Sequence, residues 1–380
     1  MPPSLIYLDN NATTKVDPRV VEKMLPYFTE RYGNPSSLSH SAGWSAKNAL
    51  DAAREQVAAL IHASPDEIVF TSGATESNNI VLFAAARSGA SILSTPVEHS
   101  SILNPLKHIA REKSNILLMP VDSLGRVEVG TIASGDAFEG ALVSVILANN
   151  EIGTIQNLAA IAEECRPGKF LLHTDATQAV GKIPINVNDL NVDFLSLSAH
   201  KFHGPKGAGA LYIRKSRLKL PPLTFGGGQE RGIRPGTENV PAIVGMGEAA
   251  RLCAEELDAN SETLTSLRDL LQQNIVESLD DVRVNGDIKS RLPNTLSLTI
   301  SGVDAEELLL KTPGVCFSTG SACETGSGKS SHVLTAIGMT REEAHSTIRL
   351  AVSRFSTVDE VQQASAHIVS AVKSIRSDRF

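Results

Sequence analysis

Short apolar runs recur along the first half of the chain and alternate with longer segments that are richer in polar residues. Their centres lie about 23 to 28 residues apart, which fits a strand followed by a crossover helix. The runs occupy residues 66–70, 91–94, 115–120, 141–148, 169–174 and 192–198. A further run at residues 208–215 follows too soon for a crossover helix, so we expect this strand to return antiparallel. The pattern predicts an α/β fold with a mostly parallel sheet flanked by helices.

A long segment rich in alanine and other apolar residues divides the chain. Residues 240–257 are typical of a helix, and the alternation of strands and helices becomes looser beyond them. We therefore place a domain boundary on this helix. The large domain is expected to comprise residues 15–253, and a smaller α+β domain residues 1–14 and 254–380.

Composition narrows the class of protein. The 380 residues are 42% hydrophobic, which is enough for a large core, and 35 basic against 42 acidic side chains give a net charge of −7. The sequence has no long basic run, no signal-peptide pattern and no stretch of about eighteen apolar residues. We expect a cytoplasmic protein with no direct nucleic-acid partner and no membrane partner.

The four cysteines have neither the spacing of a zinc site nor the density of a disulfide scaffold. Cys165, Cys253 and Cys316 stand beside apolar or helical sequence, where a small buried side chain is the simplest interpretation. Cys323 differs, because its surroundings, STGSACETGSGKSS, are too poor in apolar residues for a core position. We therefore expect an exposed thiol at Cys323.

Two further motifs imitate known sites but are incomplete. His200 and His203 form H-x-x-H, yet a zinc site needs a third ligand, and the following Gly-Pro argues against a helix that presents both. Residues 326–331, GSGKSS, imitate a P-loop, but the full pattern requires glycine at the position of Cys323. We expect neither a resident metal nor a nucleotide site.

Polar residues follow the predicted strands at the points where ligands collect in open parallel sheets. After the first strand, residues 71–76 open a helix with small side chains, which is typical of an anion cradle because free backbone N–H groups point outward there. The later strands are followed by Glu98, His99, Asn149, Asn150, Glu151, Asp175, Gln178, Ser198, His200 and Lys201. An acid, an amine and an anion cradle in succession indicate a single site.

Pyridoxal phosphate is a cofactor that needs all of these groups. Its phosphate binds backbone N–H and hydroxyl donors, its pyridine nitrogen needs a carboxylate, and its aldehyde needs a lysine amine. Asp175 and Lys201, one strand apart, supply the last two. Taken singly, Asp175 could equally be a helix cap and Lys201 a surface lysine, but the combination favours the cofactor.

These residues belong to motifs that span nearly the whole chain. In order, the motifs are YLDNNATT, GNPSS, TSGATESNN, VEHSS, NNEIGTIQ, HTDATQAVGK, SAHKFHGPKG, GGGQERGIRPGTEN, GSAC and IRLAVSRF. With this set the chain resembles the pyridoxal-phosphate-dependent cysteine desulfurases of the NifS/IscS type. The resemblance implies PLP fold type I with a mostly parallel seven-stranded sheet, a homodimer, and conversion of L-cysteine to L-alanine.

The resemblance also implies a role for each matching residue. Lys201 is expected to form the Schiff base, Asp175 to pair with the pyridine nitrogen, and His99 to stack on the ring and take part in catalysis. The remaining cofactor contacts are expected from Ala74, Thr75, Gln178, Ser198, His200 and Thr237, the last of which would reach the phosphate of the other subunit. Asn150 and Arg349 are expected to bind the substrate carboxylate. For Arg349 a purely structural salt bridge is also a reasonable interpretation.

Cys323 matches the nucleophile that accepts the sulfur in this family. Its persulfide would pass sulfur to an acceptor or an iron–sulfur scaffold protein, and Cys323 is also the single candidate for a transient iron–sulfur ligand. The GSAC motif is similar to that of the group with the longer cysteine loop, although Glu324 and residues 327–329 depart from the residues that are frequent there.

Three alternatives share much of this pattern. A selenocysteine lyase or an aminotransferase of the same fold type would have everything up to Lys201, but transamination needs no thiol at Cys323. A catalytically silent scaffold protein with this fold is the alternative from a different class, and the intact Lys201, Asp175 and Cys323 argue against it.

Overall fold

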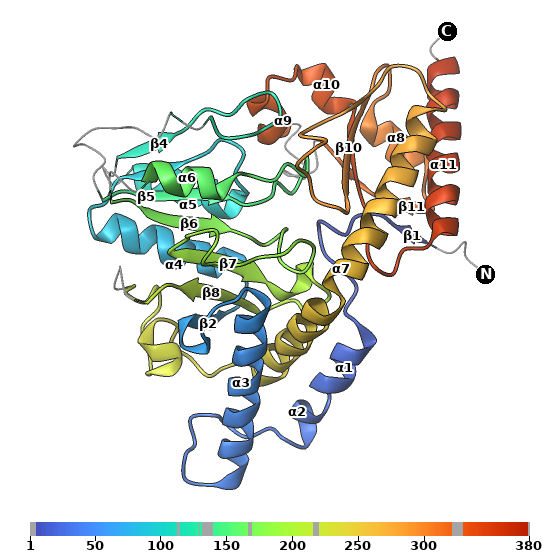
Figure 1. Cartoon of the computed structure of the whole chain (residues 1–380). Coiled ribbons are helices and arrows are strands. Elements are labelled where there is room, and N and C mark those ends of the chain that lie inside the picture. Colours follow the sequence, from blue (N-terminus) through green and yellow to red (C-terminus); the bar gives the residue numbers. More distant parts are fainter. Residues whose placement is uncertain are drawn as a thin grey trace.

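The computed structural model describes residues 5–111, 115–128, 130, 140–165, 169–215, 220–320 and 330–378 (Figure 1). Its larger sheet has seven strands in the order β2-β8-β7-β6-β5-β3-β4. These are β2 (Ile68–Thr71), β3 (Ile92–Ser94), β4 (Ile116–Leu118), β5 (Leu142–Ile146), β6 (Leu171–Asp175), β7 (Phe194–Ser198) and β8 (Gly209–Ile213). β8 pairs antiparallel with β2 and β7, and the other neighbours run parallel. The predictions of a mostly parallel sheet and of one returning strand are confirmed.

Helices cover both faces of this sheet. α4 (Ala74–Arg87) and α5 (Ser100–Ala110) pack in one hydrophobic cluster. α3 (Ser41–Leu60), α6 (Leu158–Cys165) and the first half of α7 (Val240–Val276) pack in a second cluster with the same strands. Because both faces are covered, every residue of β5 and β7 is buried, as is usual in parallel sheets.

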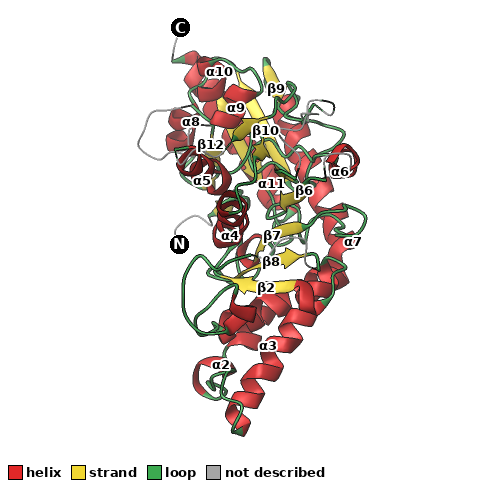
Figure 2. Cartoon of the chain, turned by 90° about the vertical axis from the view of Figure 1, so that its left-hand side faces the viewer, coloured by secondary structure: helices red, strands yellow, loops and turns green. Residues whose placement is uncertain are grey.

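A smaller antiparallel sheet, in the order β12-β13-β10-β9, forms the other part of the molecule. Its strands are β9 (Val282–Val284), β10 (Thr295–Ile300), β12 (Ser318–Thr319) and β13 (Thr347–Ala351). α8 (Ala305–Lys311), α11 (Val358–Ser377) and the second half of α7 contribute to a third hydrophobic cluster on this sheet. The 37-residue α7 thus packs against both parts, and in the side view of Figure 2 the strands β9, β10 and β12 lie toward the opposite end from β2.

The beginning of the chain also connects the two parts. β1 (Ile6–Tyr7) pairs in parallel with β11 (Val315–Cys316), beside the smaller sheet. The chain then passes to α1 (Pro18–Met24) and α2 (Pro26–Thr29), which lie at the other end of the molecule (Figure 1). Among the described residues, the remaining short helices are α9 (His332–Ala336), α10 (Arg341–His345) and the 3-10 helices Pro65–Glu67, Ala199–Lys201 and Gln229–Gly232.

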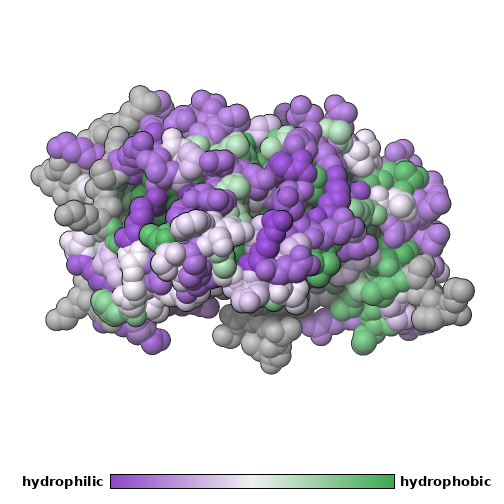
Figure 3. Space-filling model, turned by 90° about the horizontal axis from the view of Figure 1, so that it is seen from below, coloured by the Kyte–Doolittle hydropathy of each residue, from purple (hydrophilic) through white to green (hydrophobic). Residues whose placement is uncertain are grey.

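The surface seen from the side of α2 is mainly hydrophilic, and its hydrophobic side chains gather mostly toward the end that carries α11 (Figure 3). Within the described residues, none of the helices combines the length and the hydrophobicity that crossing a bilayer requires.

Candidate active site

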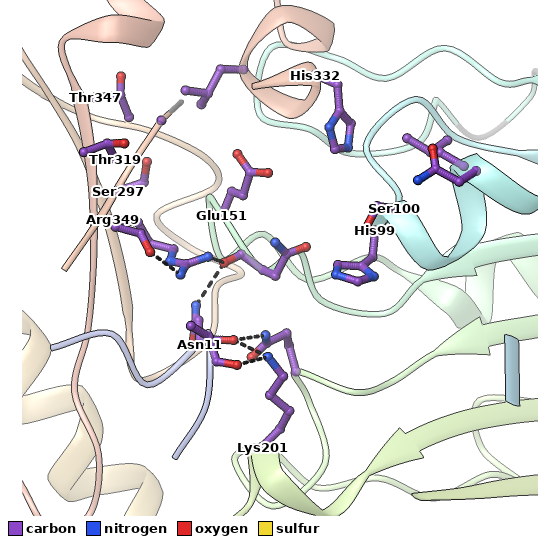
Figure 4. A pocket seen from close by; sticks show the side chains of 18 of the residues that line it. Asn11, His99, Ser100, Glu151, Lys201, Ser297, Thr319, His332, Thr347 and Arg349 are labelled. Carbon is purple, nitrogen blue, oxygen red and sulfur yellow. Dashed lines mark hydrogen bonds between the residues drawn. The ribbon is translucent and has the colours of Figure 1, made fainter. Parts of the chain in front are cut away.

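Two adjoining cavities lie beside the larger sheet, and the outer one reaches the smaller sheet. The inner cavity, of about 460 Å³, is at the carboxyl ends of β6 and β7 and the start of α4. The outer cavity, of about 450 Å³, extends from there to β12 and β13 (Figure 4). Both are lined by Ala12, His99, Asn150, Gln178 and Lys201. The two cavities therefore adjoin, with polar side chains at their junction.

Asp175 lines the inner cavity from the last position of β6. Its Oδ2 accepts a hydrogen bond from Asn78 Nδ2 at 2.8 Å, and its Oδ1 accepts one from the backbone N–H of Thr177 at 3.0 Å. The carboxylate is buried, yet it retains lone pairs beyond these two bonds. It can therefore hold a further donor, such as a protonated ring nitrogen.

The start of α4 forms the opposite end of the inner cavity. Within the described chain, no side chain caps this helix, whose N-cap residue is Gly73. A Cβ at Gly209 would lie 2.5 Å from the Cα of Gly73, so only glycine allows β8 to approach so closely. Exposed N–H groups of a helix start favour an anion. The hydroxyl groups of Thr75 and Ser198 line the same cavity.

His200 lines the inner cavity as an uncharged side chain. Burial, together with the nearby Lys201, lowers the pKa of His200 to about 4. One of its ring nitrogens, Nδ1, forms a hydrogen bond with Thr13 Oγ1 at 3.1 Å. At neutral pH His200 can therefore contribute a hydrogen bond but no charge to an anion site.

Lys201 follows β7 in a short 3-10 helix, so its amine reaches the junction of the cavities. Lys201 Nζ donates hydrogen bonds to the backbone carbonyl groups of Asn11 and, at 2.8 Å, Ala12. Gln178 Nε2 donates to the same Asn11 carbonyl at 2.9 Å (Figure 4). These bonds to carbonyl groups of the N-terminal segment place a primary amine at the junction, where it could exchange them for a covalent partner.

Gln178 is in turn oriented by a buried lysine that the sequence analysis did not identify. Lys182 Nζ donates to the backbone carbonyl of Gln178 at 2.8 Å and to its Oε1 at 3.2 Å. Because Oε1 accepts from the Lys182 amine, the amide N–H₂ of Gln178 points away from Lys182 and toward the Asn11 carbonyl. Burial, followed by the nearby Lys201, lowers the pKa of Lys182 to about 7.

Arg349 on β13 faces the outer cavity. Its Nη1 donates to the backbone carbonyl of Asn150 at 3.1 Å, and its Nη2 donates to Asp9 Oδ1 at 2.6 Å and to Ser318 Oγ at 2.8 Å. Within the described residues, Arg349 Nε and Asn150 Oδ1 are buried without a hydrogen-bond partner. A carboxylate entering the outer cavity could therefore accept from the guanidinium, which already has a structural ion pair.

Two predicted site residues are not in these cavities. Thr237 is exposed and lines neither of them. Cys323 lies outside the described residues, although Gly320, the last described residue before it, lines the outer cavity. The other predicted residues all line one or both cavities: Ala74, Thr75, His99, Asn150, Asp175, Gln178, Ser198, His200, Lys201 and Arg349.

Several polar residues that shape the cavities escaped the sequence analysis. Asn11 belongs to the YLDNNATT motif and Asn78 to TSGATESNN, but a motif does not reveal which way a side chain turns. His332 on α9 lines the outer cavity, and its Nε2 donates to the backbone carbonyl of Glu98 at 2.8 Å. Burial raises the pKa of Glu98 to about 8, so this carboxyl is mostly protonated at neutral pH.

Comparison with known proteins agrees with this architecture. The model of the aminotransferase class-V family matches residues 6–364. The chain is 43% identical over 376 residues to a cysteine desulfurase of Mus musculus, covering 98% of this chain and 82% of that protein. It is equally identical to the cysteine desulfurase IscS of Neisseria meningitidis, covering 98% and 93%.

A solved structure described as a NifS-like protein superposes with a TM-score of 0.90 at 38% sequence identity. The superposition covers 97% of this chain and 100% of that one. The likeness therefore extends over both sheets and both cavities. The chain belongs to the aminotransferase class-V family and, within it, to the cysteine desulfurases of the NifS/IscS type.

Proposed function

We propose that this protein is a pyridoxal-phosphate-dependent cysteine desulfurase that converts L-cysteine to L-alanine and keeps the sulfur as a persulfide on Cys323. The observation that carries the proposal is the junction of the two cavities. There Lys201 stands between a cavity with the Asp175 carboxylate and a cavity with the Arg349 guanidinium. The membership of the chain in the cysteine desulfurases supports the same reaction.

The inner cavity suits the cofactor in its donors and acceptors. The start of α4, with Ala74 and Thr75, and the side chains of Ser198 and His200 would hold the phosphate. Asp175 would hold the ring nitrogen, and Gln178, oriented by Lys182, would donate to the ring oxygen. When bound, pyridoxal phosphate supplies the electron sink for the charge left on the substrate Cα.

Residues of the chain would bind the substrate, transfer the proton and accept the sulfur. Asn150 and Arg349 bind the substrate carboxylate and so fix which substrate bond faces Lys201. The amine of Lys201 takes the proton from Cα. The Cys323 thiolate attacks the substrate sulfur: an S–S bond forms, the Cβ–S bond breaks, and its electron pair stays with the three-carbon skeleton. Protonation of that skeleton gives alanine.

The functional unit proposed is a homodimer. The glycine-rich loop before α7 carries Thr237, which lines neither cavity of its own chain, and Phe225, whose side chain is 87% exposed. Both side chains are exposed in the single chain, where a second copy could cover them. Thr237 would thereby reach the phosphate in the partner's inner cavity.

We propose that the chain forms two domains with different tasks. Residues 15–253 would form the large cofactor domain, and residues 1–14 with 254–380 the smaller domain that carries Cys323. In support, the hydrophobic cluster on the smaller sheet combines Ile6 and Leu8 with residues from Leu264 onward. The Cys323 persulfide would deliver sulfur to an acceptor protein, such as an iron–sulfur scaffold, in the reducing cytoplasm.

The test follows one turnover with L-cysteine. Mass spectrometry is expected to place one extra sulfur atom on Cys323, and alanine should form in equal amount. Cys323→Ser should bind the cofactor but lose roughly a hundredfold or more of its sulfur release, because a hydroxyl cannot form the persulfide.

The matched control is Cys316→Ser, since Cys316 is the nearest other cysteine in the sequence and burial raises the pKa of its thiol. This variant should keep its activity within about twofold. Extra sulfur on Cys316, or undiminished desulfuration by Cys323→Ser, would reduce the protein to an ordinary lyase or aminotransferase.

A further inference from the structure

His99 is tied to the start of α5 by a hydrogen bond that restricts its chemistry. It is the N-cap residue of this helix, and its Nδ1 accepts a hydrogen bond from the backbone N–H of Ser101 at 3.1 Å. A nitrogen that accepts from an N–H group carries no proton itself. As long as the cap is intact, the single ring proton of neutral His99 must therefore reside on Nε2.

A second donor reinforces this choice. Ser101 Oγ lies 2.8 Å from the same Nδ1 and also 2.8 Å from Asn78 Nδ2. The atom of Asn78 that faces Ser101 also lies 2.8 Å from the carboxylate of Asp175, so it must be the amide nitrogen Nδ2. An amide N–H₂ group donates hydrogen bonds and accepts none. Ser101 Oγ therefore accepts from Asn78, and its own hydrogen is left to donate to His99.

The amide of Asn78 thus serves both functional side chains at once. One of its hydrogens goes to Asp175 and the other to Ser101, and the side chains of Asn78, Ser101 and Asp175 are all buried. In the described part of the chain, Asn78 Oδ1 is buried without a partner, so its two donated bonds alone hold the amide in place. Exchanging oxygen and nitrogen in this amide would set an oxygen against the carboxylate, which excludes the flipped orientation.

We propose that Asn78 and Ser101 are positioning residues that hold His99 as its Nε2–H tautomer, with Nδ1 closed by the helix cap and Nε2 available to the cavities. His99 is then a neutral hydrogen-bond donor toward an electron-rich atom of a bound ligand, and it cannot act as a base through Nδ1. This assignment deepens the proposed desulfurase function and rests on it for its catalytic meaning. The tautomer itself follows from the hydrogen bonds of the protein alone.

The charges around His99 are balanced rather than one-sided. Asp175 and Glu151 favour a charged ring, whereas Lys201 and His332 oppose it, and burial of the ring, the largest effect, lowers the pKa of His99. The ring is accessible through the cavities but is surrounded by protein on its other sides. Lys107, Arg349, His200 and Lys206 also line the two cavities. Protonation of Nδ1 would in addition break the α5 cap, so the cap itself opposes a charged ring.

The decisive measurement is ¹⁵N NMR of the full-length protein with labelled histidine, with and without the cofactor. The signals of His99 are assigned by their loss in His99→Gln. We expect a protonated Nε2 and an unprotonated Nδ1 at neutral pH in both forms. A protonated Nδ1 in the wild-type protein would overturn the proposal, whatever the enzyme turns over.

Variants test the chain of hydrogen bonds from Asn78 through Ser101 to His99. Ser101→Ala and Asn78→Ala should each raise the pKa of His99 by about 0.4 to 1 unit, the equivalent of one lost hydrogen bond. Ser101→Thr, which keeps the hydroxyl, should restore the wild-type value. Asn79→Ala is the matched control, because the side chain of Asn79 donates instead to the Thr75 carbonyl within α4. An unchanged His99 pKa in Ser101→Ala would overturn the role of Ser101.

Turnover gives an independent readout in the same variants. Ser101→Ala should lower kcat while KM for L-cysteine stays within about twofold, and Ser101→Thr should recover kcat. If the tautomer is as expected but no variant or wild-type protein desulfurates cysteine, the proposed function fails and the positioning network stands. A kcat of Ser101→Ala equal to that of wild type would overturn the catalytic part of the inference.

Discussion

The two cavities are built in different ways. The inner cavity takes Asp175 and Ser198 from the ends of neighbouring strands, whose backbone ladders hold them in register, and Lys201 from the short helix that follows β7. The outer cavity joins segments that are remote in the sequence: Arg349 contacts Asp9 across 340 positions and Asn150 across 199. The residues around the inner cavity, here called the inner half of the site, are thus preorganised by the sheet. The residues around the outer cavity, the outer half, depend on individual polar contacts between the two parts of the chain.

This difference suggests how each half responds to substitution. Removing a functional group from the inner half should abolish chemistry while leaving the scaffold intact, because the sheet and not the side chain fixes the geometry. Removing one from the outer half should chiefly weaken substrate binding. The predictions below test that contrast, beginning with the change that should cost most.

The largest loss is expected from Lys201→Ala. The amine is the base proposed for the Cα proton and the covalent anchor of the cofactor, so turnover should fall roughly a thousandfold or more. Circular dichroism should be unchanged. In the wild-type protein, borohydride should attach the cofactor to Lys201 alone, as peptide mass spectrometry can verify. Attachment to Lys206, which lines the same inner cavity, would move the chemistry to another residue.

Asp175→Ala should be the next most damaging change. Without the carboxylate the ring nitrogen loses its partner, and kcat should fall roughly a hundredfold. The variant also leaves Asn78 Nδ2 and the Thr177 N–H without their acceptor, so the free energy of unfolding should drop by about 1 to 3 kcal/mol. Denaturant titration separates the two effects. If a folded Asp175→Ala variant still produced alanine at nearly the wild-type rate, the inner half would tolerate the loss of its carboxylate. The expected contrast between the two halves would then be wrong.

The sequence predicts the inner half better than the outer half for the same physical reason. Strand ends are visible as the last residues of apolar runs, so Asp175, Ser198 and Lys201 could be placed at one edge before any coordinates were known. Asp9 and Arg349 carry no such periodic signal. Their ion pair exists only because β1 packs beside the smaller sheet, which single-sequence patterns do not reveal.

Contacts between remote residues are equally hidden from the sequence around the inner cavity. Asn78 lies on α4, and nothing in its spacing shows that its amide turns toward Asp175, 97 positions away. The contact depends on how α4 packs on the sheet. Thr237 remains a prediction from resemblance, because the partner proposed for it belongs to a second chain.

In the outer half, Arg349→Gln should mainly raise KM for L-cysteine. A charge-assisted bond to a carboxylate contributes about 1.5 to 3 kcal/mol, which corresponds to an increase of roughly 10- to 150-fold. Inhibition by cysteamine, which lacks the carboxylate, should change little. The control is Arg283→Gln, because Arg283 is exposed and pairs with Glu343 on the surface. A variant that loses kcat but keeps its KM would place Arg349 in the chemistry of the inner half.

The smallest effect is expected at Asp9, where the sign of the change is the informative result. Asp9 Oδ1 accepts from Arg349 Nη2 and from Ser318 Oγ, and its negative charge partly neutralises the guanidinium that the substrate carboxylate must approach. Asp9→Asn keeps an acceptor oxygen in place but removes the charge. Because the ion pair is partly exposed, with 20% and 11% of the two side chains accessible, the charge is worth about 0.3 to 1 kcal/mol.

KM for L-cysteine should therefore fall by about two- to fivefold in Asp9→Asn, whereas Asp9→Ala, which also loses the acceptor, should raise it. A second readout needs no turnover. Burial raises the pKa of the Cys316 thiol and the Asp9 carboxylate adds to that rise, so alkylation of Cys316 should shift to lower pH in Asp9→Asn. If KM rises equally in both variants while the Cys316 profile shifts as expected, Asp9 acts only by orienting Arg349. The outer half would then be as preorganised as the inner one, held by an ion pair in place of a sheet.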